Sequence, residues 1–229
     1  MTWAGTLLSV DAKATTRASL FGTVWMAGMS SVVRLGFGLA AGFGGENILR
    51  RMESLRHQLR RARWGLPLAR VIAGEVGESK AAVGGLVLEL FGDDVEVRKR
   101  AADVARRITE RDGRLLEPYA DELAGLLESL PVEESRTRWH LGLVVPRVAH
   151  TRAQRLRAAR TMSLLAGDES NGVRCSAMEG LGLLALQEAS LRDEAEEMIE
   201  RFLREGTKAM KCRARAVMQL WTRSERQKK

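Results

Sequence analysis

The chain has 229 residues and a mass of 25.3 kDa, and 45% of its residues are hydrophobic, which excludes disorder over the whole length. It has four prolines and few aromatic residues, a composition typical of packed helices rather than of a β-sandwich or barrel. Two cysteines are too few for a disulfide framework, so a reducing, cytoplasmic setting is expected. The formal charge of +8 favours acidic partners such as nucleic acid, anionic lipid or an acidic protein.

Residues 1–51 differ in composition from the rest of the chain. Ala18 to Val33 carries no charge, Arg34 interrupts the apolar run, and a glycine-rich stretch follows. Neither apolar piece reaches the roughly 20 residues that cross a bilayer, and the flanking charges do not match an export signal. We therefore expect no strong membrane anchor. A weak membrane contact stays open, but we prefer a segment that is poorly ordered or no part of the native protein, with translation beginning at Met52.

From Lys80 onward, segments of helical period alternate with short polar turns, and one segment repeats. Residues 88–101 resemble residues 164–177: each runs from an apolar helix end through glycine and acidic residues into Val-Arg-x-x-Ala. Weaker copies lie at 130–141 and 203–214. The basic residues of the four copies lie 40, 36 and 37 positions apart, at Arg98, Arg138, Arg174 and Lys211. This period is typical of stacked helix pairs, because neither helix of a pair can bury its apolar stripe alone.

The best copies are Asp94-Val-x-Val-Arg98-x-x-Ala101 and Gly172-Val-Arg174-x-x-Ala177. They resemble the HEAT-repeat family, whose second helix often begins with Asp followed by Val-Arg and a small residue. The resemblance covers about residues 80–223 and implies an all-α fold, a right-handed alpha-alpha superhelix (a HEAT-like repeat solenoid) of about four helix pairs. Residues 80–229 would then form the repeat domain, with 52–79 as an N-terminal cap or a degenerate repeat.

Several residues of these copies have physical roles that are independent of the family. Asp93 or Asp94 is expected to cap the following helix by accepting from its free backbone amides. The small Ala101 and Ala177 would let neighbouring helices approach closely. The repeated arginines are expected to reach acidic or carbonyl groups in the adjoining turn. The pair Gly180-x-Gly182 lies within a helical pattern, so it indicates tight helix packing rather than a phosphate-binding loop.

The sequence contains no catalytic or metal-binding motif that we recognise. The three histidines are far apart, and Cys175 and Cys212 lack the spacing of a zinc or redox site. Stacked helices lie about 8 to 10 Å apart, which is too far for a disulfide, so both thiols are expected to be reduced and half-buried. We therefore expect no enzymatic activity, no cofactor and no metal.

The first functional hypothesis is a non-catalytic protein–protein interaction scaffold, in which the second helices of the repeats line a concave surface. Helix phase alone selects the exposed residues that would contact the partner. They are Arg100, Arg107, Trp139, Arg147 and Glu179.

The second hypothesis is nucleic-acid binding, because no acidic residue lies between Glu134 and Asp168 while seven arginines do. Arginine suits phosphate recognition because its donors form a planar, permanently charged fork. Besides Arg147, these residues are Arg136, Arg138, Arg152, Arg155, Arg157 and Arg160. A relation to DNA glycosylases built on HEAT-like repeats is one form of this hypothesis, but no acid follows Trp139 within a turn, so the catalytic part of that resemblance fails. A third functional class is that of lyase-type or phycobilisome-related HEAT proteins, but no residue of this sequence points to it specifically.

Overall fold

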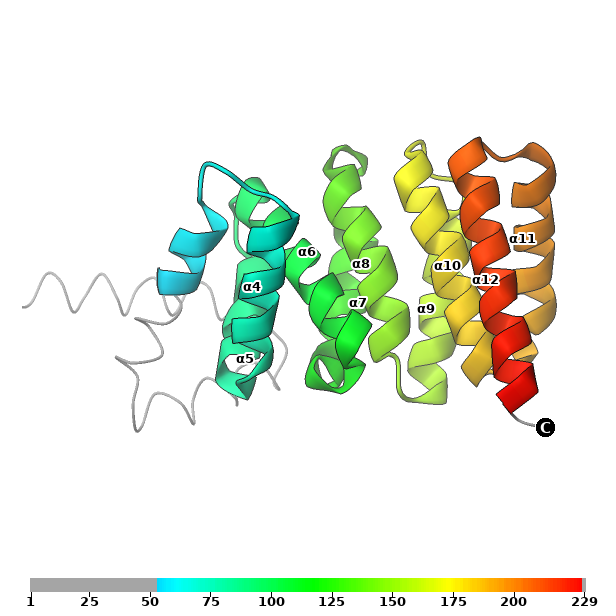
Figure 1. The fold of residues 1–229 in the computed structure, drawn as a ribbon, viewed down its shortest axis with the longest axis horizontal. Coiled ribbons are helices and arrows are strands. Elements are labelled where there is room, and N and C mark those ends of the chain that lie inside the picture. Colours follow the sequence, from blue (N-terminus) through cyan, green and yellow to red (C-terminus); the bar gives the residue numbers. More distant parts are fainter. Residues whose placement is uncertain (1–52, 228–229) are drawn as a thin grey trace, which may run out of the picture. The chain divides into compact units, whose positions relative to one another are not determined.

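The computed structural model describes residues 53–227, and this part of the chain is helical throughout, without a β-strand (Figure 1). A short helical segment over residues 53–59 comes first. The helices that follow are α4 (Leu66–Gly77), α5 (Lys80–Leu90), α6 (Val95–Arg111), α7 (Ala120–Ser129), α8 (Ser135–Val148), α9 (Arg152–Leu165), α10 (Asn171–Gln187), α11 (Arg192–Glu205) and α12 (Lys208–Gln227). The predicted all-α class is therefore confirmed for the described residues.

The helices pack in two layers. In one layer, which we call the even layer, α4 packs against α6, α6 against α8, α8 against α10, and α10 against α12. The odd layer contains α5, α7, α9 and α11, and each of these packs against the even helix that follows it in the chain. Figure 1 shows the resulting pairs side by side in chain order. The chain thus places consecutive pairs next to one another, as the repeat predicted.

Local sequence signals explain where the helices begin. Asp94 precedes α6, and its carboxylate accepts from the backbone amide of Val97 at 3.1 Å, which confirms the second of the two predicted caps. Thr151 precedes α9 and forms a reciprocal capping box with Gln154. In both cases a side-chain oxygen satisfies a backbone N–H that has no partner within the helix.

Small residues set the distance between the helices of the even layer. Ala101 and Ala177 are fully buried, as predicted. A Cβ atom added at Gly180 would lie 2.7 Å from Pro146 Cγ of α8 and 2.7 Å from Met162 Sδ of α9. One added at Gly182 would meet the Val217 side chain of α12. Tight packing is thus the role of both glycines.

The basic residue of each repeat copy contacts a neighbouring turn or helix. Arg98 donates to the carbonyl of Gly92 at 2.7 Å and forms a buried ion pair with Glu134, so its predicted role is confirmed. Arg138 pairs with Asp168 at 2.5 Å. The basic residues of the last two copies make other kinds of contact. The Arg174 guanidinium lies 5.6 Å from the Phe202 ring, and Lys211 donates to the Arg204 carbonyl at 3.1 Å.

The described residues all belong to one compact unit, Leu49–Lys229. Residues 52–79 contribute to the same core as the repeats, because Leu59 and Ile72 are buried in it. The expectations for residues 1–51 lie outside the described residues. Both cysteines are free thiols, but Cys212 is exposed rather than half-buried because the buried side of α12 is formed by other positions.

Candidate functional site

A row of charged and aromatic side chains crosses the even layer from α6 to α12. We call it the charged stripe. Its members are Arg106 and Arg107 of α6, Trp139, His140 and Arg147 of α8, Glu179 of α10 and Arg213 of α12.

Ion pairs link the helices of the charged stripe. Glu179 accepts from two arginines on different helices, Arg147 of α8 at 3.3 Å and Arg213 of α12 at 3.0 Å. On α6, the buried Asp103 is likewise shared by Arg106 at 3.2 Å and Arg107 at 3.0 Å. Each of these carboxylates serves two guanidinium groups, and Arg106 also pairs with Glu110 of α6. Four arginines therefore share three carboxylates. One excess donor is Arg147 Nη1, which is buried and has no hydrogen-bond partner among the described residues.

The aromatic part of the stripe lies in the middle, on α8. The rings of Trp139 and His140 stack with centroids 4.6 Å apart. The Arg106 guanidinium lies 6.0 Å from the Trp139 ring, near the outer limit of a cation–π contact. On the α10 side, Gly172 lies next to the indole, since a Cβ atom built there would be in ordinary van der Waals contact with Trp139 at 3.8 Å. The tryptophan thus bridges three helices of the even layer.

His140 is a buried and neutral imidazole. Its side chain packs between helices with the residue only 6% exposed, and its Nδ1 atom has no partner among the described residues. Burial lowers the pKa of His140 to about 4, with Asp103 opposing the shift and Arg106, Arg107 and Arg136 adding to it. The neutral ring therefore keeps the stripe free of a further cation at pH 7.

The five residues predicted for partner contact all lie in the even layer, on α6, α8 and α10. The sequence predicts that these five side chains are exposed. In the structure all five residues are half-buried. Arg107, Arg147 and Glu179 have side chains that are only 13%, 17% and 16% exposed, because each pairs with a charge on its own or a neighbouring helix. Helix phase selected the right layer but could not reveal these pairs.

Arg100 serves the fold more than a partner. Its guanidinium donates to the carbonyls of Leu59 at 2.6 Å and Arg61 at 2.8 Å, and it lies 5.4 Å from the Trp64 ring. These carbonyls end the first helical segment and have no acceptor role within a helix, so the arginine caps that end. Arg100 therefore attaches residues 53–64 to the repeats.

The arginines of the nucleic-acid hypothesis are divided between the two layers. Arg136 and Arg138 lie on α8 in the even layer, whereas the other four, Arg152, Arg155, Arg157 and Arg160, lie on α9 in the odd layer. The sequence predicts that these arginines have no acidic partners, because none lies near them in the chain. This prediction is wrong for most of them. Acids from other segments supply the counter-charges.

These counter-charges are specific. Arg138 pairs with Asp168, and Arg157 pairs with Glu128 at 2.5 Å. Glu188 lies 3.5 Å from Arg152 and 3.7 Å from Arg155. Arg136 and Arg160 are exposed.

Sequence reasoning missed Arg106, His140 and Arg213 as members of the stripe. Arg213 follows Lys211 by two positions in the last copy of the repeat. This copy resembles the others only weakly, so the sequence does not show which face of its helix packs against α10. Sequence spacing separates His140 from the other two histidines, and it places His140 within the arginine-rich interval. Its adjacency to Trp139 was the available signal.

The described residues contain no group of three or more side chains suited to hold a metal ion, and none of their helices combines the length and apolarity needed to cross a membrane. The fold and the stripe define an all-helical, two-layer protein whose even layer carries paired charges around a tryptophan. No protein-family model matches the chain, and no curated protein matches its sequence.

Proposed function

We propose that this chain is a non-catalytic protein-interaction scaffold, a HEAT-like right-handed superhelix of about four helix pairs whose even layer is the concave, partner-binding face. The partner segment that best suits the charged stripe carries carboxylates. The observation that carries this proposal is the sharing of Glu179 by Arg147 and Arg213 across three helices.

The chemistry of the stripe supports an acidic partner. Four arginines share Asp103 and Glu110 of α6 and Glu179 of α10, so the stripe has one more cation than carboxylates. An incoming carboxylate would accept from Arg213, the arginine of the stripe that is 49% exposed. A bidentate arginine contact is among the stronger hydrogen-bonded pairs in proteins. Trp139 adds a large apolar surface at the centre, the kind of residue that dominates binding energy at interfaces.

The test is binding of the full chain to a fluorescein-labelled acidic peptide that contains one central aromatic residue, followed by fluorescence anisotropy. Arg213→Ala should weaken binding by about threefold to tenfold, because it removes one charged donor. Arg213 is 49% exposed, so the fold should tolerate the change. The matched control is Arg215→Ala, an exposed arginine on the same helix, which should leave affinity within about twofold. If both variants lose the same affinity for the peptide, the effect is general electrostatic attraction and the proposal is refuted.

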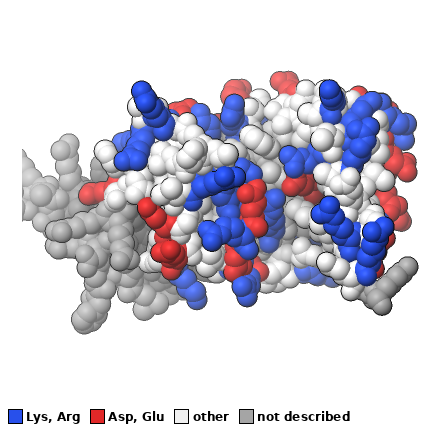
Figure 2. Space-filling model, in the orientation of Figure 1, with Lys and Arg blue, Asp and Glu red and all other residues white. Residues whose placement is uncertain are grey.

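A second candidate is nucleic-acid binding through α12. This helix carries six basic residues from Lys208 to Arg226 against the single acid Glu225, and Figure 2 shows Lys and Arg side chains gathered over it. Under this candidate, affinity for a labelled DNA or RNA duplex would fall steeply as salt rises. Reversing the charge of Arg215 and Arg223 would abolish such binding, whereas reversing Arg152, Arg155 and Arg157 of α9 would test the group predicted from the sequence.

A further inference from the structure

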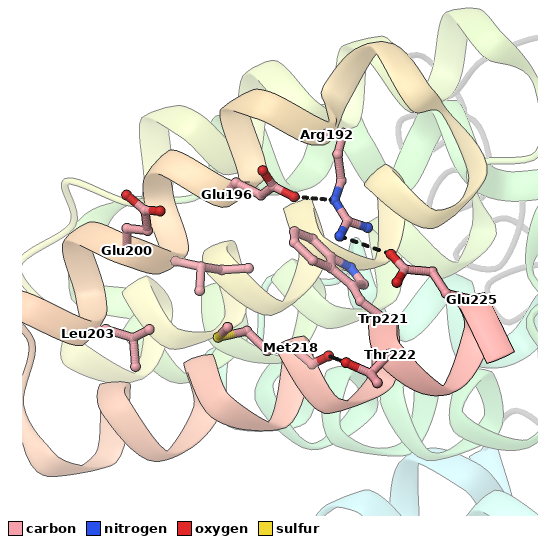
Figure 3. Close-up of a pocket in the computed structure, with 9 residues that line it drawn as sticks. Arg192, Glu196, Glu200, Leu203, Met218, Trp221, Thr222 and Glu225 are labelled. Atoms are coloured by element: carbon pink, nitrogen blue, oxygen red, sulfur yellow. Dashed lines mark hydrogen bonds and ion pairs between the residues drawn. The ribbon is translucent and has the colours of Figure 1, made fainter.

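A groove opens between α11 and α12 and encloses about 200 Å³ (Figure 3). We call it the C-terminal groove. It is lined by Arg192, Glu196, Ile199, Glu200, Leu203, Met218, Trp221, Thr222 and Glu225. It shares no residue with the charged stripe, so an inference about it does not depend on the function proposed above.

The floor of the C-terminal groove is apolar. Ile199 and Trp221 are buried at its base, Leu203 is half-buried, and Met218 of α12 is 45% exposed. Methionine is unbranched and polarizable, so it adapts to different apolar partners. An exposed methionine above a buried tryptophan therefore offers a contact surface for an apolar side chain.

One end of the groove is held in a fixed geometry. The Trp221 indole donates from Nε1 to the carbonyl of Gly182 on α10 at 2.9 Å. The Arg192 guanidinium lies over the ring, 3.6 Å from its centroid. Arg192 itself donates to Glu196 at 2.6 Å and to Glu225 at 3.2 Å, as Figure 3 shows. Such a prearranged wall reduces the entropy that an incoming ligand must lose.

The rim of the groove is acidic, in contrast to the basic chain. Glu196, Glu200 and Glu225 face a single arginine among the lining residues, whereas the whole chain has a formal charge of +8. Glu196 and Glu225 share Arg192, and Glu200 lies 3.7 Å from Arg204. The three carboxylates are 49%, 70% and 61% exposed, in the order Glu196, Glu200 and Glu225, so they can still reach a partner. This sign of charge disfavours nucleic acid, anionic lipid and the acidic segment proposed for the charged stripe.

The dimensions indicate what kind of partner fits. Pockets for small molecules usually enclose about 300 to 1,000 Å³, so a volume of 200 Å³ suits one or two apolar anchors of a larger partner. The groove also follows two neighbouring helices that pack against each other, which is the geometry of helix-in-groove recognition. We propose that the C-terminal groove binds a basic amphipathic helix of a partner protein, with apolar residues seated on Met218 and Leu203 and Lys or Arg residues paired with the glutamates of the rim.

The experiment uses the full chain and a fluorescein-labelled amphipathic helical peptide of about 18 residues, with leucines at helical spacing on one face and lysines and arginines beside them. The controls are a peptide of the same composition in scrambled order and a peptide with glutamate in place of each basic residue. Anisotropy should show saturable binding of the amphipathic basic peptide only. Equal binding of the scrambled peptide would overturn the proposal.

Two pairs of variants test the apolar floor and the acidic rim separately. Met218→Arg should weaken binding by about tenfold, because it removes an apolar contact and adds a repelling charge. Its control is Leu220→Arg, since Leu220 is 38% exposed on the same helix but does not line the groove. Glu200→Lys should weaken binding by about threefold at low salt and less at high salt, whereas Glu197→Lys on the same helix, outside the groove, should not.

Circular dichroism will establish that each variant is folded, and light scattering will report the size of the wild-type chain. If Met218→Arg leaves peptide affinity unchanged while the protein stays folded, the proposal is wrong. If the wild-type chain forms an oligomer that Met218→Arg dissociates, the occupant of the groove is a second copy of this chain, and the proposed basic helix is wrong.

Discussion

At the scale of single residues, the described part of the chain contains several ion pairs with little exposure to solvent. Arg98 is the clearest example, since one side chain joins the turn before its own helix to the turn before α8. The two side chains of its ion pair with Glu134 are 15% and 9% exposed. Removing one partner of such a pair leaves the other charge buried and unpaired.

We therefore expect Arg98→Ala to lower the free energy of unfolding by about 3 kcal/mol or more. The control is the neighbouring Lys99→Ala, which removes only an exposed pair with Glu96 on the same helix and should cost about 0.5 kcal/mol or less. Urea unfolding followed by circular dichroism measures both. Similar losses for the two variants would show that the buried pair is not a special determinant of stability.

His140 makes stability depend on pH. Its pKa is about 4 in the folded protein and about 6.5 when unfolded, so the unfolded chain takes up the proton first as pH falls. Its contribution is fully present above pH 6.5, declines as pH falls towards 4, and is lost below that. The loss amounts to up to about 3 kcal/mol.

The test compares urea unfolding of the wild type and His140→Gln between pH 7 and pH 4.5. Glutamine cannot be protonated in this range, so the variant should lose less stability over the interval than the wild type. Other groups titrate equally in both proteins, so their contribution cancels in the comparison. Parallel pH profiles would contradict the assignment.

At the scale of elements, glycine fixes how closely α8, α9 and α10 approach. A methyl group at Gly180 would collide with Pro146, whose ring cannot rotate away, and with Met162. Gly74 of α4 is also helical, but no atom lies within 4 Å of a Cβ built there. The two positions have the same residue type in the same secondary structure and differ in their surroundings.

We expect Gly180→Ala to destabilise the fold by about 1 to 3 kcal/mol through overpacking. Gly74→Ala should be neutral or stabilise the protein by up to about 1 kcal/mol, because alanine is the better helix former and narrows the unfolded ensemble. Thermal unfolding of both variants measures the difference. A stabilising Gly180→Ala would mean that the helices move apart easily at this contact.

At the scale of the whole unit Leu49–Lys229, one hydrophobic core extends from Leu55 of the first helical segment to Trp221 of α12. Residues 52–79 are integral to this core, since they contribute Leu59, Ile72 and Val76. The sequence alone is compatible with either a cap or a degenerate repeat for this segment. Their burial means that a boundary at Lys80 would cut through the core.

A fragment of residues 49–229 should therefore unfold in a single transition, with circular dichroism and tryptophan fluorescence changing together. A fragment of residues 80–229 should be less stable by about 5 kcal/mol or more, because the apolar side chains of α5 and α6 that pack against α4 become exposed. The comparison needs only urea titrations of the two fragments. Equal stability would show that residues 52–79 are dispensable for folding.

The sequence by itself determined the helical class, the pairing of helices in order, a cap at Asp93 or Asp94 and the buried small residues. These features follow from helical periodicity, backbone capping and side-chain size, which act over a few residues or recur at each repeat. Only the tertiary structure decided which arginines are paired, because Asp168, Glu179 and Glu188 lie about 30 or more residues from most of their partners in the chain. It also decided that the charged stripe and the C-terminal groove exist, since each depends on side chains that meet only when separate helices pack.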